Sequence, residues 1–159
     1  MNKLIKLTTF IAISVLLSGC FSNNVRYPNT NAKNVTINLE QGKDDRGGFF
    51  TSVEIVAGVN DVTKSGCDTE YKGFIDLKPG KNKLGLKPGK KTYILVEVAK
   101  SSHSHSSSYS RGTVFTPKKG VKYEIDVNYV DSMFDFRFYE KKKSKRKQLK
   151  IAHLPRCKK

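Results

Sequence analysis

The sequence predicts an all-β domain, folded as a single antiparallel β-sandwich or partly closed barrel of about seven to eight strands. From residue 34 onward, apolar and polar residues alternate along most of the chain, and a period of two is typical of half-buried strands. Glycine, proline and aspartate turns separate the alternating segments, as expected for hairpins. No segment after residue 33 has the spacing of an amphipathic helix. Many short strands joined by turns are typical of sandwiches and barrels.

The expected strands follow one another along the chain. Val35, Ile37 and Leu39 mark the first strand, and residues 41–48 form a loop. Further strands are expected at residues 49–57, 71–77, 84–86, 92–99, 112–116, 121–129 and 134–138. The last two show the clearest alternation and carry aromatic residues on one face, so we expect a hairpin that turns at Asp131-Ser132.

One turn motif occurs twice. Leu77-Lys78-Pro79-Gly80-Lys81 recurs as Leu86-Lys87-Pro88-Gly89-Lys90, and Pro-Gly suits the two central positions of a type II turn. With the Thr92–Val98 strand that follows, this order resembles small bacterial envelope domains of the PEGA-like kind, and lipoproteins of unknown function with a similar hairpin. The resemblance covers roughly residues 71–140. It implies a non-enzymatic β-domain of the envelope and assigns no functional residue.

The N-terminus has the three parts of a secretory signal. Lys3 and Lys6 precede an apolar stretch at residues 7–17, which is shorter than the roughly 20 residues of a membrane-spanning helix. Leu17-Ser18-Gly19-Cys20 follows and resembles the lipobox of bacterial lipoproteins. The resemblance implies cleavage before Cys20 and lipidation of that cysteine. The alternative is a buried apolar helix that happens to end in Gly-Cys.

This interpretation divides the chain into four parts. They are a signal peptide at residues 1–19, a flexible tether at 20–33 that begins at lipidated Cys20, the β-domain at 34–140, and a basic C-terminal segment at 141–159. Lipid chains would anchor the protein without spanning the membrane. Phe21 stands where lipoproteins of enterobacterial type carry an aspartate for inner-membrane retention, so the resemblance favours anchoring in the outer membrane of the cell envelope. The domain could then lie on the periplasmic or on the outer face of that membrane.

The cysteine count agrees with export. If Cys20 is lipidated, Cys67 and Cys157 remain, and a cysteine pair in an oxidising compartment predicts a disulfide. The alternative is two unpaired thiols.

Basic residues are concentrated at the C-terminus. Residues 141–159 hold ten Lys or Arg and no acid, whereas residues 20–140 carry 18 basic and 14 acidic groups. A block of like charges often serves as an interaction arm. The block consists of Lys141, Lys142, Lys143, Lys145, Arg146 and Lys147. We expect it to contact anionic lipid, lipopolysaccharide phosphates or an acidic protein, and export argues against nucleic acid. The alternatives are a solvated hairpin end and lysines that prevent edge-to-edge strand pairing.

The remaining candidate chemistry is sparse. His103 and His105 lie in the serine-rich stretch Ser101–Ser110, where their spacing suits a transition metal, but a low-complexity solvent loop is the alternative. The sequence has no nucleophile elbow, Walker loop, His-Glu-x-x-His or Cys-x-x-Cys motif. We therefore predict no enzyme activity and no cofactor. The expected function is a binding or scaffolding lipoprotein; the alternatives are an accessory lipoprotein of a secretion or surface machine, and a metal-binding periplasmic protein.

Overall fold

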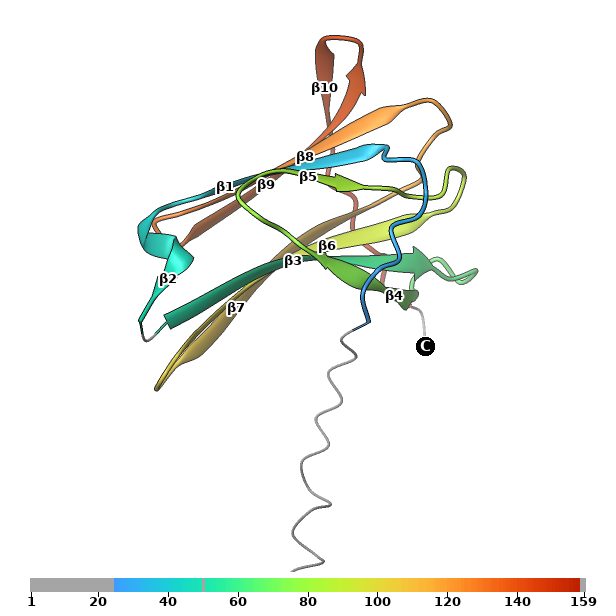
Figure 1. The fold of residues 1–159 in the computed structure, drawn as a ribbon. Helices are drawn as coiled ribbons and strands as arrows, with labels where there is room; N and C mark the ends of the chain where they lie inside the picture. The colour runs from blue at the N-terminus through green and yellow to red at the C-terminus, as the bar shows by residue number, and fades with distance from the viewer. Residues whose placement is uncertain (1–24, 50, 158–159) are drawn as a thin grey trace, which may run out of the picture.

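The computed structural model describes residues 25–49 and 51–157, and over this range the protein is an all-β sandwich, as predicted (Figure 1). The strands are β1 (Val35–Gln41), β2 (Gly47–Gly48), β3 (Thr51–Val62), β4 (Thr69–Asp76), β5 (Gly80–Leu84), β6 (Thr92–Ser102), β7 (Ser106–Phe115), β8 (Lys122–Val130), β9 (Met133–Lys142) and β10 (Lys145–Leu149). A single 3-10 turn, η1 (Asp44–Arg46), lies between β1 and β2. Within the described ranges, no helix is long and apolar enough to cross a bilayer.

The strands form two sheets that face each other (Figure 1). Sheet A has the order β2-β3-β6-β7, and β4 also pairs with β3. Sheet B has the order β10-β9-β8-β1-β5. Every strand pairing is antiparallel except that of β1 with β8, in which Ile37 lies opposite Ile125.

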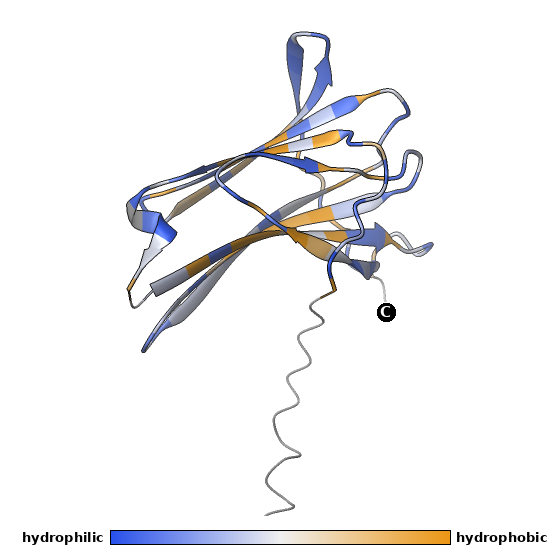
Figure 2. Ribbon diagram, in the orientation of Figure 1, coloured by the Kyte–Doolittle hydropathy of each residue, from blue (hydrophilic) through white to orange (hydrophobic). Residues whose placement is uncertain are grey.

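The inner faces of the two sheets form the core (Figure 2). The predicted alternation supplies this face, since Val35, Ile37 and Leu39 are buried and successive strand residues point to opposite sides. Opposite them, Ile94, Val96 and Val98 of β6 are also buried. The other large buried side chains are those of Ile55, Val59, Leu77, Leu84, Leu86, Tyr123, Ile125, Val127, Tyr129, Phe136 and Phe138.

Two segments are strands where the sequence did not predict them. The serine-rich stretch Ser101–Ser110 was expected to be a solvent loop, but it forms the far end of the β6–β7 hairpin, with Ala99 opposite Ser108 and Ser101 opposite Ser106. The basic segment likewise continues β9 and then forms β10. Serine and lysine have little intrinsic strand preference, so pairing with β6 and β9 imposes the extended conformation.

The beginning of the described chain also differs from the expectation. Residues 25–33 were predicted to be a tether, but they pack along the open side of the sandwich. Tyr27 and Val25 exchange backbone hydrogen bonds with Phe74 of β4, and the Asn29 carboxamide bonds to backbone groups next to or within β5. Gly85 permits this packing, because a Cβ there would lie 2.1 Å from the Asn31 carbonyl oxygen.

The predicted disulfide is present. Cys67, in the β3–β4 turn, is bonded to Cys157, and their Cα atoms are 5.1 Å apart. Before Cys157 the chain passes along β7, where the Val114 amide donates to the Ala152 carbonyl. The segment after β10 is therefore fixed to sheet A, although β10 belongs to sheet B.

Candidate functional site: a basic hairpin

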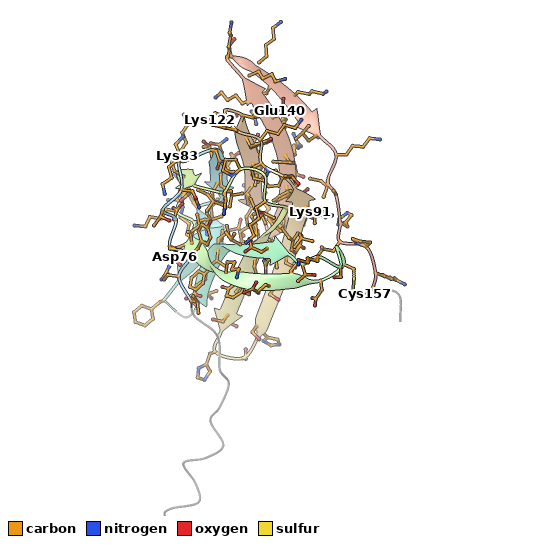
Figure 3. The ribbon with its side chains drawn as sticks, turned by 90° about the vertical axis from the view of Figure 1, so that its right-hand side faces the viewer. Asp76, Lys83, Lys91, Lys122, Glu140 and Cys157 are labelled. Carbon is orange, nitrogen blue, oxygen red and sulfur yellow. A yellow bond between two sulfur atoms is a disulfide. The ribbon has the colours of Figure 1, made fainter. Side chains whose placement is uncertain are left out.

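The basic block predicted from the sequence forms the end of the β9–β10 hairpin. The hairpin projects beyond the rest of the sandwich (Figures 1 and 3). Its connection is Lys143-Ser144, and the register places Lys145 opposite Lys142 and Arg146 opposite Lys141. Strand alternation then puts Lys141 and Arg146 on the outer face of sheet B, and Lys142 and Lys145 on the other face. The block therefore divides into two groups.

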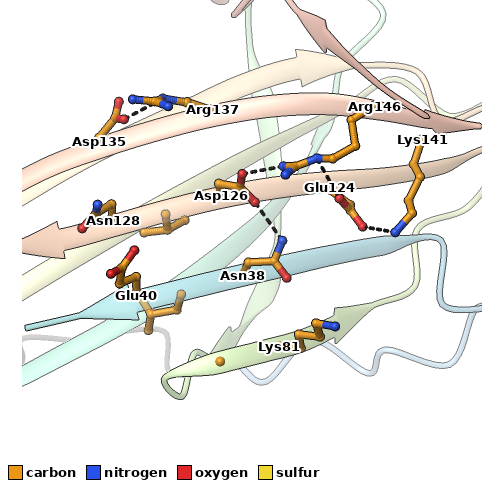
Figure 4. A pocket seen from close by; sticks show the side chains of 13 residues that line it. Asn38, Glu40, Lys81, Glu124, Asp126, Asn128, Asp135, Arg137, Lys141 and Arg146 are labelled. Atoms are coloured by element: carbon orange, nitrogen blue, oxygen red, sulfur yellow. Dashed lines mark hydrogen bonds and ion pairs between the residues drawn. The ribbon is translucent and has the colours of Figure 1, made fainter. Parts of the chain in front are cut away.

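The outer-face group is paired with acids of β8. Glu124, whose side chain is only 12% exposed, accepts from Lys141 at 2.6 Å and from Arg146 at 3.0 Å (Figure 4). Arg146 also binds Asp126 and stacks over the Tyr139 ring at 3.9 Å. The hydrogen bond that Arg146 donates to Asp126 is the main reason that the pKa of Arg146 is raised above its ordinary value. Arg146 thereby fastens β10, and Lys141 the end of β9, to β8, and the charge of the two cations is largely neutralised.

The second group consists of Lys142, Lys143, Lys145 and Lys147, and most of its positive charge is not neutralised by neighbouring acids. Lys142 pairs with Glu140 at 3.2 Å, but its own side chain is 77% exposed, and solvent weakens an ion pair with so exposed a partner. Lys143, Lys145 and Lys147 make no ion pair with a described residue. The six basic residues and the acids Glu124, Asp126 and Glu140 leave a formal charge of 6 − 3 = +3.

Two features of the hairpin oppose its stability. Lys145 lies directly across from Lys142, and like charges at such positions destabilise a strand pair. Lys143 has a φ of 52°, a left-handed conformation that costs a residue with a Cβ about 1–2 kcal/mol and favours glycine or asparagine. The stability of the hairpin therefore does not explain why lysine occupies these positions.

A shallow hollow of about 650 Å³ lies beside the hairpin on the outer face of sheet B (Figure 4). Asn38 donates to Asp126 at 2.8 Å, and Arg137 pairs with Asp135 at 2.8 Å. Acidic and basic side chains alternate across the hollow, and most of them form ion pairs with one another. The Asn38–Asp126 pair joins β1 to β8, and the Arg137–Asp135 pair lies within β9. The spacing of these residues in the sequence gives no sign of the Asn38–Asp126 pair.

The two candidate metal ligands lie in the β6–β7 connection. His103 and His105 are both exposed, and the described residues contain no group of three or more His, Cys, Asp or Glu side chains that could hold a metal ion. The third histidine, His153, lies after β10.

Asp45 is a structural residue that the sequence did not reveal. It was placed in a loop, yet it is buried and its carboxylate accepts from the amides of Asp131 and Ser132 at 2.6 and 3.1 Å. It caps the β8–β9 turn, where both turn residues have positive φ.

Comparison with known proteins adds no family assignment. No family model matches the chain, and no curated protein or solved structure matches it either. Cys20 and the lipobox lie outside the described residues.

Proposed function

We propose that this protein is a lipid-anchored, non-enzymatic binding domain of the cell envelope, which presents the β9–β10 hairpin to an anionic partner. The observation that carries the proposal is the group Lys142, Lys143, Lys145 and Lys147, exposed on a projecting hairpin at a cost in stability. The lipobox at Leu17–Cys20 supports the anchor.

The position of the anchor favours an accessory role within a larger envelope assembly. Residues 25–33 contact β4 and β5, and β5 is the edge of sheet B opposite β10 (Figure 1). The five residues 20–24 would span at most about 17 Å when fully extended. A lipid on Cys20 would hold the β4–β5 side near its membrane and direct the hairpin away from it. The partner would then be an acidic protein or lipopolysaccharide beyond the anchoring lipid.

Binding to defined anionic surfaces tests the proposal. The unlipidated chain should bind vesicles that contain anionic lipid or lipopolysaccharide, and binding should weaken as salt rises. Changing Lys142, Lys143, Lys145 and Lys147 to Ser should abolish it, whereas Lys78→Ser, at an exposed position in the β4–β5 turn, should not. Equal binding by both variants would contradict the proposal. Crosslinking of the lipidated protein in envelopes then distinguishes a protein partner from lipopolysaccharide.

A further inference from the structure

A second pocket lies between the sheets, between the β6–β7 hairpin and the β8–β9 turn. On β6 the inward-facing residues change from Val96 and Val98 to Lys100 and Ser102, so the inner face is polar at this end. The pocket has a volume of about 360 Å³, within the range of small-molecule sites. Its lining consists of Thr51, Lys100, Ser102, His105, Ser107, Tyr109, Tyr129 and Ser132.

The lining has a distinct chemistry. Six of its eight side chains carry a hydroxyl group, one is an ammonium and one an imidazole, and none is a carboxylate. Lys100 makes no ion pair with any residue in the described ranges. Hydroxyl, ammonium and imidazole groups all donate hydrogen bonds. The lining therefore complements an anion with several acceptor oxygens.

Tyr129 provides the second, independent observation. It is completely buried, and its phenol oxygen has no hydrogen-bond partner among the described residues. Leaving a buried polar group unpaired costs about 1–3 kcal/mol, and phenylalanine would fill the same space without that cost. Tyr129 lines the pocket, so an oxygen atom of a ligand that reaches the buried phenol oxygen would satisfy it.

We propose that this pocket binds a phosphate group, either as the free ion or as part of a phosphorylated sugar. Lys100 would neutralise the charge, and the hydroxyls of Ser107, Tyr109 and Tyr129 would donate to phosphate oxygens. The Ser102 hydroxyl already donates to the His105 carbonyl. The serine-rich stretch supplies four of the lining residues: Ser102, His105, Ser107 and Tyr109. The site is separate from the basic hairpin and does not depend on its proposed role.

Titration followed by amide NMR of the full chain in detergent tests the proposal. The hairpin also attracts anions, so the variant with Lys142, Lys143, Lys145 and Lys147 changed to Ser serves as the background. Inorganic phosphate, glucose 1-phosphate and glucose are titrated separately. We expect saturable shifts at Ser102, Ser107 and Tyr109 with at least one phosphate-bearing probe, and weaker binding of glucose.

The three probes give distinct outcomes. Equal affinity for phosphate and glucose 1-phosphate identifies the free ion as sufficient, whereas tighter binding of glucose 1-phosphate shows that the sugar also makes contacts. Both results support the proposal. Linear, non-saturating shifts with every probe, or glucose binding as tightly as its phosphate, would overturn it.

Two variants assign the residues. Lys100→Met should lower the affinity at least tenfold, and Tyr129→Phe about fivefold while the protein stays folded. The matched control is Lys91→Met, which removes an exposed lysine immediately before the other end of β6 and should leave the affinity unchanged. If Lys100→Met binds as tightly as the control, the pocket is not the site.

Discussion

The β6–β7 and β9–β10 hairpins both carry sequences with little strand preference, yet they are held in different ways. The end of β6–β7 is rich in serine, and its described side chains form no ion pairs. The β9–β10 hairpin is fastened by Glu124, which pairs with one cation from each strand. The first hairpin is held by backbone pairing and by serine hydrogen bonds, such as Ser101 with Ser52 and Ser102 with the His105 carbonyl. The second also has a buried acid.

The two hairpins also differ in the interaction they offer. Unpaired lysines act on anions over about a Debye length, roughly 8–10 Å, and salt weakens them. Hydroxyl groups act only at hydrogen-bond distance, so they select a ligand by its shape. The β9–β10 hairpin suits capture of a large anionic surface, and the β6–β7 hairpin suits a small ligand.

The largest expected effect comes from removing the disulfide that fixes the chain after β10. With Cys67 and Cys157 both changed to Ser, the free energy of unfolding should fall by up to about 4–5 kcal/mol, given a separation of 90 residues. Urea denaturation measures the loss. Amide exchange should accelerate at Val114, which bonds to the segment after β10, more than at Ser108. Equal acceleration at both amides would contradict a local role.

Removing the charge of Glu124 should selectively loosen the basic hairpin. We expect Glu124→Gln to lower the free energy of unfolding by about 1–2 kcal/mol, less than a fully buried pair would lose, because Lys141 and Arg146 are about 40% exposed. Glu54→Gln is the control, since Glu54 is exposed and makes no ion pair with a described residue. A loss of similar size in both variants would show that the network does not support β10.

The Lys143→Gly variant separates stability from binding at the hairpin tip. Glycine adopts positive φ without steric cost, so this variant should be more stable by about 1 kcal/mol in thermal or chemical unfolding. Its affinity for anionic vesicles should fall about fivefold, since one lysine near such a surface contributes about 1 kcal/mol. A variant that gains stability and keeps its affinity would remove Lys143 from the contact.

The smallest effect is expected at the tip of β6–β7. Changing His103 and His105 to Ala together should alter the free energy of unfolding by no more than about 0.5 kcal/mol, because both side chains are exposed. Calorimetric titration of the unchanged protein with Zn²⁺ should give no binding heat. Saturable heat that disappears in the double variant would instead support the metal-binding alternative.

The sequence predicted those strands whose inner face alternates without interruption. β1 and β8 begin and end close to where the apolar pattern placed them, whereas β6 and β9 begin there but continue to Ser102 and Lys142. β3 is longer than expected because Gly58, Asn60 and Asp61 interrupt the pattern, yet they continue the pairing with β6. The disulfide followed from the cysteine count.

The site was less predictable, because its properties come from pairings between distant residues. In the sequence the six basic residues form one block. Only the register of β8, β9 and β10 shows that Glu124 neutralises two of them, Lys141 and Arg146. The polar pocket similarly requires β6, β7 and β8 to be brought together. Its only sequence sign is the change from valine to Lys100 on the inner face of β6.

The parallel pairing of β1 with β8 has a consequence for the order of folding. Their partner residues are 88 positions apart, and contacts that close such long loops form slowly. β1 can pair with β5 early, and β6 can then cover its apolar side chains, but its other edge stays unpaired until β8, in the last third of the chain, is available. A chain synthesised or exported from its N-terminus therefore passes through a stage in which one edge of this apolar strand is unpaired. At that stage it is prone to aggregation, and a chaperone that binds extended apolar segments would increase its yield.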